Sequence, residues 1–129
     1  MRVTNPPLPE SHVAGLRDVV QGLAARPDVD AVVVLSSDGL PIDSAGRTDL
    51  DAEAVAALAA TFANGARRLG EAAECAGLGG TVVEFEERLA VLRPLGAEGH
   101  LFILAARETN IGPLLFDLRR DAPTLATLL

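Results

Sequence analysis

The chain has 129 residues, of which 49% are apolar, and it carries a formal net charge of −7 with an isoelectric point near 4.7. This length suits one domain, which can bury roughly 65–70% of the surface of its extended chain. Binding to a phosphate backbone needs a basic stripe, and base stacking needs aromatic platforms. The acidity and the low aromatic content, four Phe with no Trp or Tyr, therefore argue against a nucleic-acid partner.

The single cysteine, Cys75, cannot form an intramolecular disulfide, which suits a reducing compartment. Residues 1–12 lack the apolar core of a signal peptide. No apolar run reaches the roughly 18–20 residues of a membrane span. These features predict a cytoplasmic protein without membrane insertion. All eleven basic residues are arginine, which we interpret as the codon bias of a GC-rich bacterial genome.

The prolines of "TNPPLPE" predict a disordered lead-in over residues 1–8, and residues 9–129 are expected to form a single domain. In residues 9–25 apolar side chains recur at spacings of three and four, the pattern of an amphipathic helix. Pro27 should end this helix. The segment "VDAVVVLS" (29–36) is apolar and β-branched nearly throughout, which predicts a strand covered on both faces.

A second strand is expected in residues 40–46, with Pro41 tolerable at an edge or a bulge. Between the strands, "SSDG" (36–39) is typical of a hairpin turn, because Asp accepts local hydrogen bonds and Gly supplies a positive φ. Two serines beside an acid could also belong to a nucleophilic triad. The sequence has no G-x-S-x-G elbow and places neither His12 nor His100 near these serines. We therefore favour the turn.

The longest helix is predicted in residues 50–74, with acids at its start where the helix dipole favours negative charge. Small residues flank its apolar stripe and permit the close approach of another helix. The stripe consists of Val55, Leu58, Phe62, Ala66, Leu69 and Ala73. "CAGLGG" (75–80) should end the helix, with Cys75 as a small packing residue rather than a redox thiol.

"GLGGT" (77–81) has the glycine content of a phosphate-binding loop, but it lies between a helix and a strand and lacks the Lys-Ser/Thr of a P-loop. We therefore interpret its glycines as helix-ending residues. Two distant histidines and one cysteine offer no metal-ligand spacing. The residues thus predict no metal site, no bound cofactor and no catalytic group.

Three strands are expected in residues 81–87, 88–95 and 100–107, and their short connections predict an antiparallel meander. The last two have continuous apolar cores. The first alternates apolar residues with glutamates, which we interpret as its solvent-facing side rather than as acid–base groups. A half-polar strand at the end of a meander is a candidate edge strand.

A closing helix is predicted in residues 110–123, with Asn110 near the N-cap and Pro113 in the first turn. Pro123 should end or kink it. On the longest helix, Arg67 and Arg68 are partner-binding candidates, because an arginine inserted into a partner's nucleotide site can assist phosphoryl transfer. A solvated helix face is the favoured alternative for both.

The order of these elements resembles the Roadblock family, which includes dynein-associated light chains and bacterial, MglB-like regulators of small Ras-like GTPases. The matching segments are the hairpin in residues 32–46, the long helix in 51–74, and the meander with the closing helix in 81–120. The resemblance covers about residues 10–121. No single motif is specific to the family, because DG turns and apolar strands are common, whereas the ordered set of segments is moderately specific.

The resemblance implies an α/β domain of the α+β sandwich kind, similar to profilin. Its five-stranded mixed or antiparallel sheet has the order 2-1-5-4-3, with the long helix on one face and the other two helices on the opposite face. It further implies a homodimer in which the third strands pair with each other and the long helices pack together. The interface residues would be Thr81, Val82, Val83, Glu84, Phe85, Leu58, Phe62 and Leu69.

The function implied by the resemblance is that of a non-catalytic, homodimeric binding module that regulates or positions a small Ras-like GTPase. The alternative is a signalling scaffold that partners a sensor kinase or another cluster component and leaves nucleotide turnover unchanged. A ligand-sensing domain is disfavoured, because nothing in the sequence indicates a group of polar residues that would converge on a pocket.

Overall fold

The computed structural model describes residues 10–129, with side chains from residue 14 onward, so the lead-in expected in residues 1–8 lies outside the described residues. The elements follow the order expected from the sequence. They are α1 (Glu10–Ala24), β1 (Val29–Ser36), β2 (Pro41–Gly46), α2 (Ala52–Ala72), β3 (Thr81–Glu84), β4 (Arg88–Leu95), β5 (Gly99–Ala106) and α3 (Ile111–Thr127).

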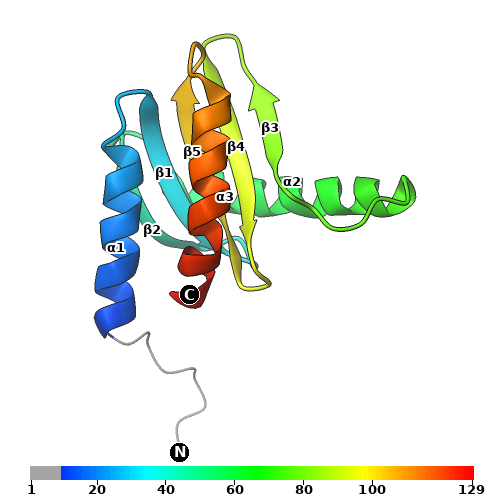
Figure 1. Cartoon of the computed structure of the whole chain (residues 1–129), viewed down its shortest axis with the longest axis horizontal. Helices are drawn as coiled ribbons and strands as arrows, with labels where there is room; N and C mark the ends of the chain where they lie inside the picture. Colours follow the sequence, from blue (N-terminus) through cyan, green and yellow to red (C-terminus); the bar gives the residue numbers. More distant parts are fainter. Residues whose placement is uncertain (1–9) are drawn as a thin grey trace, which may run out of the picture.

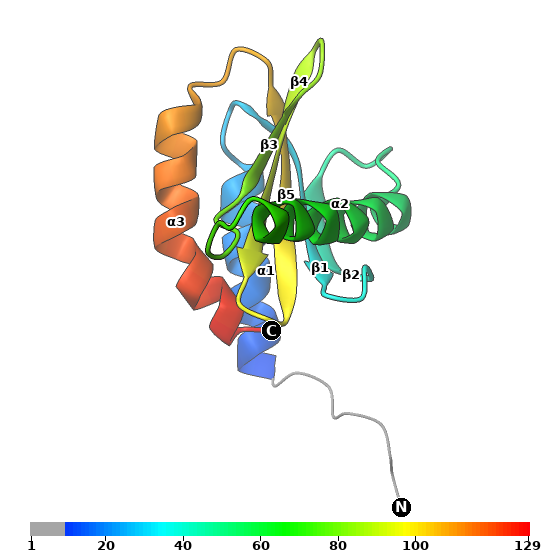
Figure 2. The same cartoon turned by 90° about the vertical axis from the view of Figure 1, so that its right-hand side faces the viewer.

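The strands form one antiparallel sheet in the order β2-β1-β5-β4-β3. α1 and α3 cover one face of the sheet, and α2 crosses the other face (Figures 1 and 2). This arrangement confirms the fold expected from the sequence. The three inner strands, β1, β5 and β4, have neighbours on both sides, whereas β2 and β3 form the edges.

The apolar run of β1 is explained by cover on both faces of the sheet. Val32 and Val34 join the core beneath α1 and α3, while Val33 and Leu35 point to α2. The core beneath α2 is completed by small side chains of the helix, so α2 lies close to the sheet. These buried helix residues are Ala56, Ala59 and Ala63.

The turn between β1 and β2 is confirmed. Gly39 has a φ of +88°, and its N–H donates to the Ser36 carbonyl (2.9 Å). The hydroxyl of Ser36 accepts the Leu40 N–H (3.1 Å), so this serine stabilises the turn. The β1–β2 turn also touches the β4–β5 turn, because the Ser37 N–H donates to the Glu98 carbonyl (3.0 Å).

Three local expectations were wrong or incomplete. β3 ends at Glu84 rather than at residue 87, because the next residues form the turn into β4, and this turn contains no Gly or Pro that would mark it. α3 runs through Pro123 to Thr127, and Figure 2 shows its axis changing direction near that end. The kink was the correct alternative there, since Pro removes one helical hydrogen bond without ending the helix.

The end of α2 differs as well. Glu74, rather than a glycine, adopts the left-handed conformation (φ +59°), and the Cys75 N–H donates to the Gly70 carbonyl (2.8 Å). This pairing satisfies an end carbonyl of the helix in the manner of a Schellman motif. Cys75 is exposed, so its expected role as a packing residue was wrong. Within residues 10–129, no helix combines the length and apolarity that a membrane crossing requires.

Candidate interaction surface on the long helix and the edge strand

The edge strand β3 pairs with β4 on one side only. The Phe85 N–H donates to the Arg88 carbonyl (2.9 Å) at the start of this ladder. Antiparallel ladders alternate between hydrogen-bonded and non-hydrogen-bonded pairs, so Val83 also directs its N–H toward β4. The N–H groups of Val82 and Glu84 consequently point to the open edge. They are available to a further strand.

The α2 helix has an apolar surface in addition to its buried one. Leu58, Phe62 and Leu69 are 68%, 54% and 71% exposed. The expected stripe thus lies largely on the exposed side of α2, while the alanines at positions 56, 59 and 63 face the core. Periodicity gives the larger side chains more weight than alanine, although alanine permits the closer contact with the sheet. Exposed large apolar side chains grouped on one helix are typical of an interaction surface.

An apolar groove of about 190 Å³ separates this side of α2 from β3. Leu58 and Phe62 form its helix wall, and Val83 and Phe85 form its strand wall. Within the part of the chain that the structure describes, no charged residue lines it. The full lining, called the apolar groove below, is Val55, Leu58, Ala59, Phe62, Thr81, Val83, Phe85, Ala90, Leu92 and Phe102.

The structure brings together five of the eight residues expected in an interface, namely Leu58, Phe62, Thr81, Val83 and Phe85. The other three lie outside the groove. Val82 is 48% exposed and lines a cavity on the opposite face of the sheet. Glu84 pairs with Arg107 (3.2 Å), and Leu69 lies closer to the end of α2.

The groove floor was not identified from the sequence. Ala90 and Leu92 of β4 and Phe102 of β5 contribute to it. Alternation along each strand assigns residues to one of two faces, so it could have shown that Ala90 and Leu92 share a face. It could not show that this face is the one α2 leaves partly uncovered.

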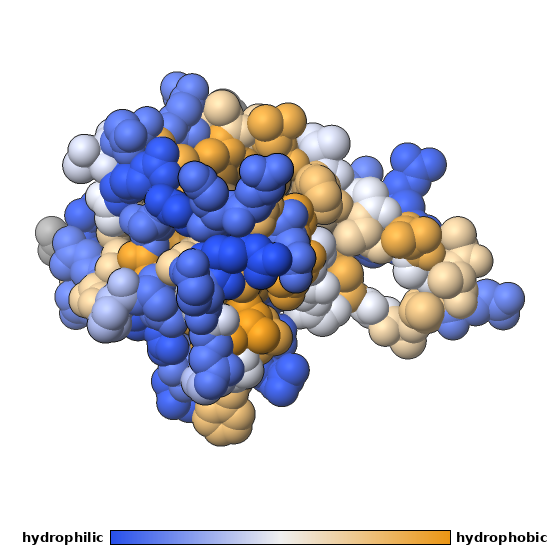
Figure 3. Space-filling view, turned by 90° about the horizontal axis from the view of Figure 1, so that it is seen from above, coloured by the Kyte–Doolittle hydropathy of each residue, from blue (hydrophilic) through white to orange (hydrophobic). Residues whose placement is uncertain are grey.

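Figure 3 views the molecule from above. Hydrophilic residues cover much of the middle of this surface. Hydrophobic residues gather toward the end at which α2 and the following loop project beyond the sheet (Figures 1 and 3). The projecting end therefore combines an apolar surface with the open edge of β3.

The two arginine candidates lie away from the groove. Arg67 donates to the Asn64 amide oxygen (2.6 Å) and lies 4.0 Å from Glu71. With Ser37 and His100, it lines a cavity of about 490 Å³ between α2 and the strand turns. Arg68 is exposed on α2. The structure therefore does not join either arginine to the apolar groove.

The histidine and serine that were not expected to meet, His100 and Ser37, line the same cavity. They do so because β1 and β5 are neighbours, with Leu35 opposite His100. Burial, followed by the positive charge of Arg67, lowers the pKa of His100. Within the described residues, no hydrogen bond joins His100 to a serine or a carboxylate, and its Nδ1 lacks a partner. A nucleophilic triad is not assembled there.

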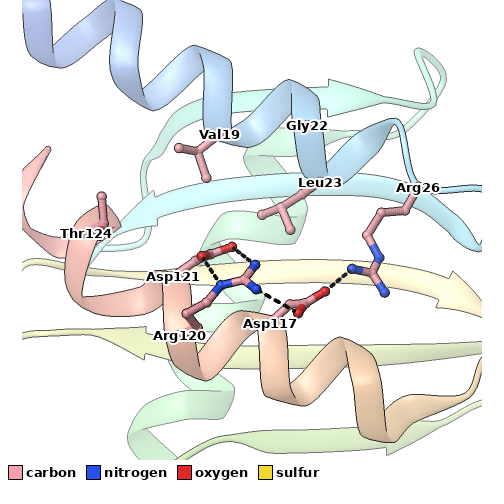
Figure 4. A pocket seen from close by; sticks show the side chains of 8 residues that line it. All are labelled: Val19, Gly22, Leu23, Arg26, Asp117, Arg120, Asp121 and Thr124. Atoms are coloured by element: carbon pink, nitrogen blue, oxygen red, sulfur yellow. Dashed lines mark hydrogen bonds and ion pairs between the residues drawn. The ribbon is translucent and has the colours of Figure 1, made fainter.

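A cleft between α1 and α3, with a volume of about 340 Å³, holds a group of paired charges (Figure 4). Arg26 contacts Asp117 (2.5 Å), and Arg120 contacts Asp117 (3.3 Å) and Asp121 (3.0 Å). Each cation therefore has a carboxylate from this chain. The Arg26–Asp117 pair connects the two helices, which is a structural role.

The family model of the Roadblock/LC7 domain matches residues 16–105. A Roadblock/LC7 domain from Streptomyces avermitilis is similar, at 26% identity over 84% of this chain and 92% of that chain, with a TM-score of 0.78. MglB from Myxococcus xanthus is 16% identical over 88% and 94% of the two chains (TM-score 0.81). The gliding protein MglB from Thermus thermophilus is 14% identical over 97% of each chain (TM-score 0.81). The MglB similarities establish a shared fold. No curated protein matches the chain.

Proposed function

Because this chain belongs to the Roadblock/LC7 domain family, we propose that it is a non-catalytic, homodimeric binding module that regulates or positions a small Ras-like GTPase. The family resemblance implies the class of partner. The apolar groove beside the open β3 edge is the observation that carries the proposal. A closed, twofold pairing would remove an edge strand and an apolar surface from water at the same time.

In the proposed dimer, β3 pairs with β3 of the second copy and the two α2 helices pack together. Phe62 and Leu58 would then contact the partner protomer, and Val82 and Glu84 would supply edge hydrogen bonds. Val83 keeps its hydrogen bond within its own protomer. The residues expected in the interface thus divide into side-chain and backbone contributors.

The proposed role requires no bond-making group from this chain. Ser36 is engaged in the turn, and His100 has no carboxylate partner among the described residues. "GLGGT" lies between α2 and β3 rather than between a strand and a helix. The protein would act on its GTPase by holding the partner's own residues in place. The cytoplasmic location and the single domain over residues 9–129 remain predictions.

The test uses the small Ras-like GTPases of the source organism, beginning with any that is encoded beside the gene of this chain. Binding is measured calorimetrically with the GTPase loaded with GDP or with a non-hydrolysable GTP analogue. We expect binding that depends on the bound nucleotide, together with changed GTP turnover. Phe62→Glu should abolish dimerisation and weaken this binding, because it places a charge in the apolar groove.

Phe116→Glu is the matched control, since Phe116 is a comparably exposed phenylalanine (63%) on α3, away from the groove. It should leave both the dimer and the GTPase binding intact. Binding without any change in turnover would favour the scaffold alternative. Absence of binding to any such GTPase would contradict the proposal.

A further inference from the structure

A cavity of about 290 Å³ lies beside β3, on the face of the sheet that α3 covers (Figure 1). Its charged lining consists of Arg93 from β4 and Arg119 from α3. Gly79 and Gly80, which precede β3, line it as well. Among the described residues no carboxylate lines it, so the cavity combines two positive charges with an open glycine backbone. We call it the arginine cavity.

Two arginines without acidic partners are unusual in this chain. Of the ten arginines in residues 10–129, seven lie within 4.0 Å of a carboxylate. The other three are Arg68, Arg93 and Arg119, and two of these line the same cavity. Acids outnumber bases by seven in the sequence, so a shortage of carboxylates does not explain the exceptions.

The cleft between α1 and α3 provides a comparison within the molecule (Figure 4). It is similar in size and also contains two arginines, Arg26 and Arg120, but Asp117 and Asp121 neutralise them. The arginine cavity has no such acids in its lining. Its two positive charges therefore have no counter-charge within 4.0 Å among the residues that the structure describes.

The hydrogen-bonding capacity of the arginine cavity is also unused. The Nε of Arg93 is buried and lacks a partner within the described residues. Buried polar groups nearly always have a hydrogen-bond partner. A guanidinium offers five N–H donors and no acceptor, so the missing partner is an acceptor.

The guanidinium of Arg93 lies beside the loop, because a Cβ built at Gly80 would be in ordinary van der Waals contact, at 3.6 Å, with one of its terminal nitrogens. We propose that the arginine cavity binds the oxyanion of a small ligand, either a phosphate ester or a carboxylate. Arg93 and Arg119 would be its counter-charges, because a planar guanidinium fork matches the oxygens of both groups. This site is independent of the proposed GTPase partner.

Gly79 and Gly80 of "GLGGT" would then line an anion site, although the segment is not a P-loop. The loop still lacks a lysine and still runs from a helix into a strand. The positive charge that a P-loop carries in its own sequence comes here from β4 and α3, more than ten residues away along the chain. Sequence spacing could not reveal this arrangement.

The test is a titration of the full-length, ¹⁵N-labelled protein with inorganic phosphate and, separately, with acetate, both at constant ionic strength. Constant ionic strength separates binding from general screening. We expect saturable shifts of the amide signals of Gly79, Gly80 and Thr81. Arg119→Gln and Arg93→Gln should each weaken the binding at least about tenfold, because each removes a charge-assisted pair.

Arg68→Gln is the matched control, because it makes the same charge change at the third unpaired arginine, outside the cavity. Its binding should stay within about twofold of the wild type. Tighter binding of phosphate would identify a phosphate ester as the ligand class, and tighter binding of acetate a carboxylate.

Absence of saturable shifts with both anions would overturn the proposal. Equal weakening by Arg68→Gln and Arg119→Gln would do the same, since it would indicate attraction by net charge alone. Arg93 is half-buried, so circular dichroism must first show that Arg93→Gln is folded. If it is not folded, the exposed Arg119 decides the result.

Discussion

Gly39 constrains the turn between β1 and β2 in two ways. Its φ of +88° lies in a region that residues with a Cβ rarely adopt. A Cβ would also lie 3.3 Å from Ala57 Cα and from Ala60 Cβ, both on α2. The turn is therefore tied to the position of the long helix, and not only to local turn chemistry.

We expect Gly39→Ala to lower the free energy of unfolding by about 1–2 kcal/mol, because it forces a side chain into a left-handed conformation. Gly22→Ala is the control. Gly22 lies in α1 with no atom within 4 Å of the Cβ position, so the change should raise stability by roughly 0.5–1 kcal/mol. Urea unfolding of both variants measures these differences. Equal effects would show that the turn is not strained.

His100 predicts a dependence of stability on pH. Burial and Arg67 lower its pKa in the folded protein, so the unfolded chain binds a proton more readily than the folded one. The stabilising contribution of the neutral imidazole is thus present above the ordinary histidine pKa and is lost as the pH falls below it. Between pH 7 and pH 5, His100→Gln should lose less stability than the wild type. An equal loss of stability in His100→Gln and in the wild type over this pH range would contradict the role given to His100.

At the scale of elements, the N–H groups of β3 point alternately to β4 and to the open edge of the sheet. Val82→Pro removes an N–H that points to the open edge, whereas the bonds to β4 remain. We expect this variant to fold but to lose the dimer. Light scattering should give 2 × 13.4 kDa, or 26.8 kDa, for the wild type and 13.4 kDa for the variant.

Val82→Ala retains the N–H and is the control for the side chain, so its mass should remain that of the dimer. A dimeric Val82→Pro would show that β3 does not pair across the interface. A monomeric wild type at micromolar concentration would contradict the dimer itself.

The sequence was sufficient to predict those strands whose apolar pattern is set by their own residues. "VDAVVVLS" predicted β1 within its observed bounds, and the apolar runs predicted β4 and β5 closely. The buried side of α2 was not predictable in this way. Two adjacent sides of this helix are apolar, and only the sheet determines that the alanine side is buried.

The candidate surface was predicted in part for a similar reason. Phe62 and Val83 were identified through the family resemblance, and the structure places both in the apolar groove. Phe102 was missed because its contribution depends on which face of β5 meets α2. The arginine cavity was missed entirely, since Arg93 and Arg119 meet only through the packing of α3 on β4.

At the scale of the whole molecule, the surfaces around the sheet have different chemistries. The apolar groove lies on the α2 side, and the arginine cavity lies on the α3 side, both beside β3. Arg67 lies in a third place, the cavity by the strand turns. A partner that contacts the paired α2 helices would therefore not need to displace an ion from the arginine cavity.

This arrangement predicts a mild effect of the α2 arginines on GTPase turnover. At saturating protein, Arg67→Ala and Arg68→Ala should each keep the turnover of the partner GTPase within about tenfold, a barrier change of roughly 1.4 kcal/mol. An inserted arginine would instead contribute about a thousandfold or more. A collapse of that size at saturation would show that one of these arginines takes part in the chemistry.

The alanine side of α2 has a consequence for the isolated protomer. Ala56, Ala59 and Ala63 bury little area each, so the helix is held to its own sheet by a small part of the apolar surface that it carries. On dilution, the α2 amides should exchange their hydrogens with solvent sooner than those of β1 and β5, because local opening begins where buried contacts are few. Packing of a second copy on α2 would suppress this local opening. The hydrogen-exchange protection of the α2 amides would then measure the fraction of the protein that is dimeric.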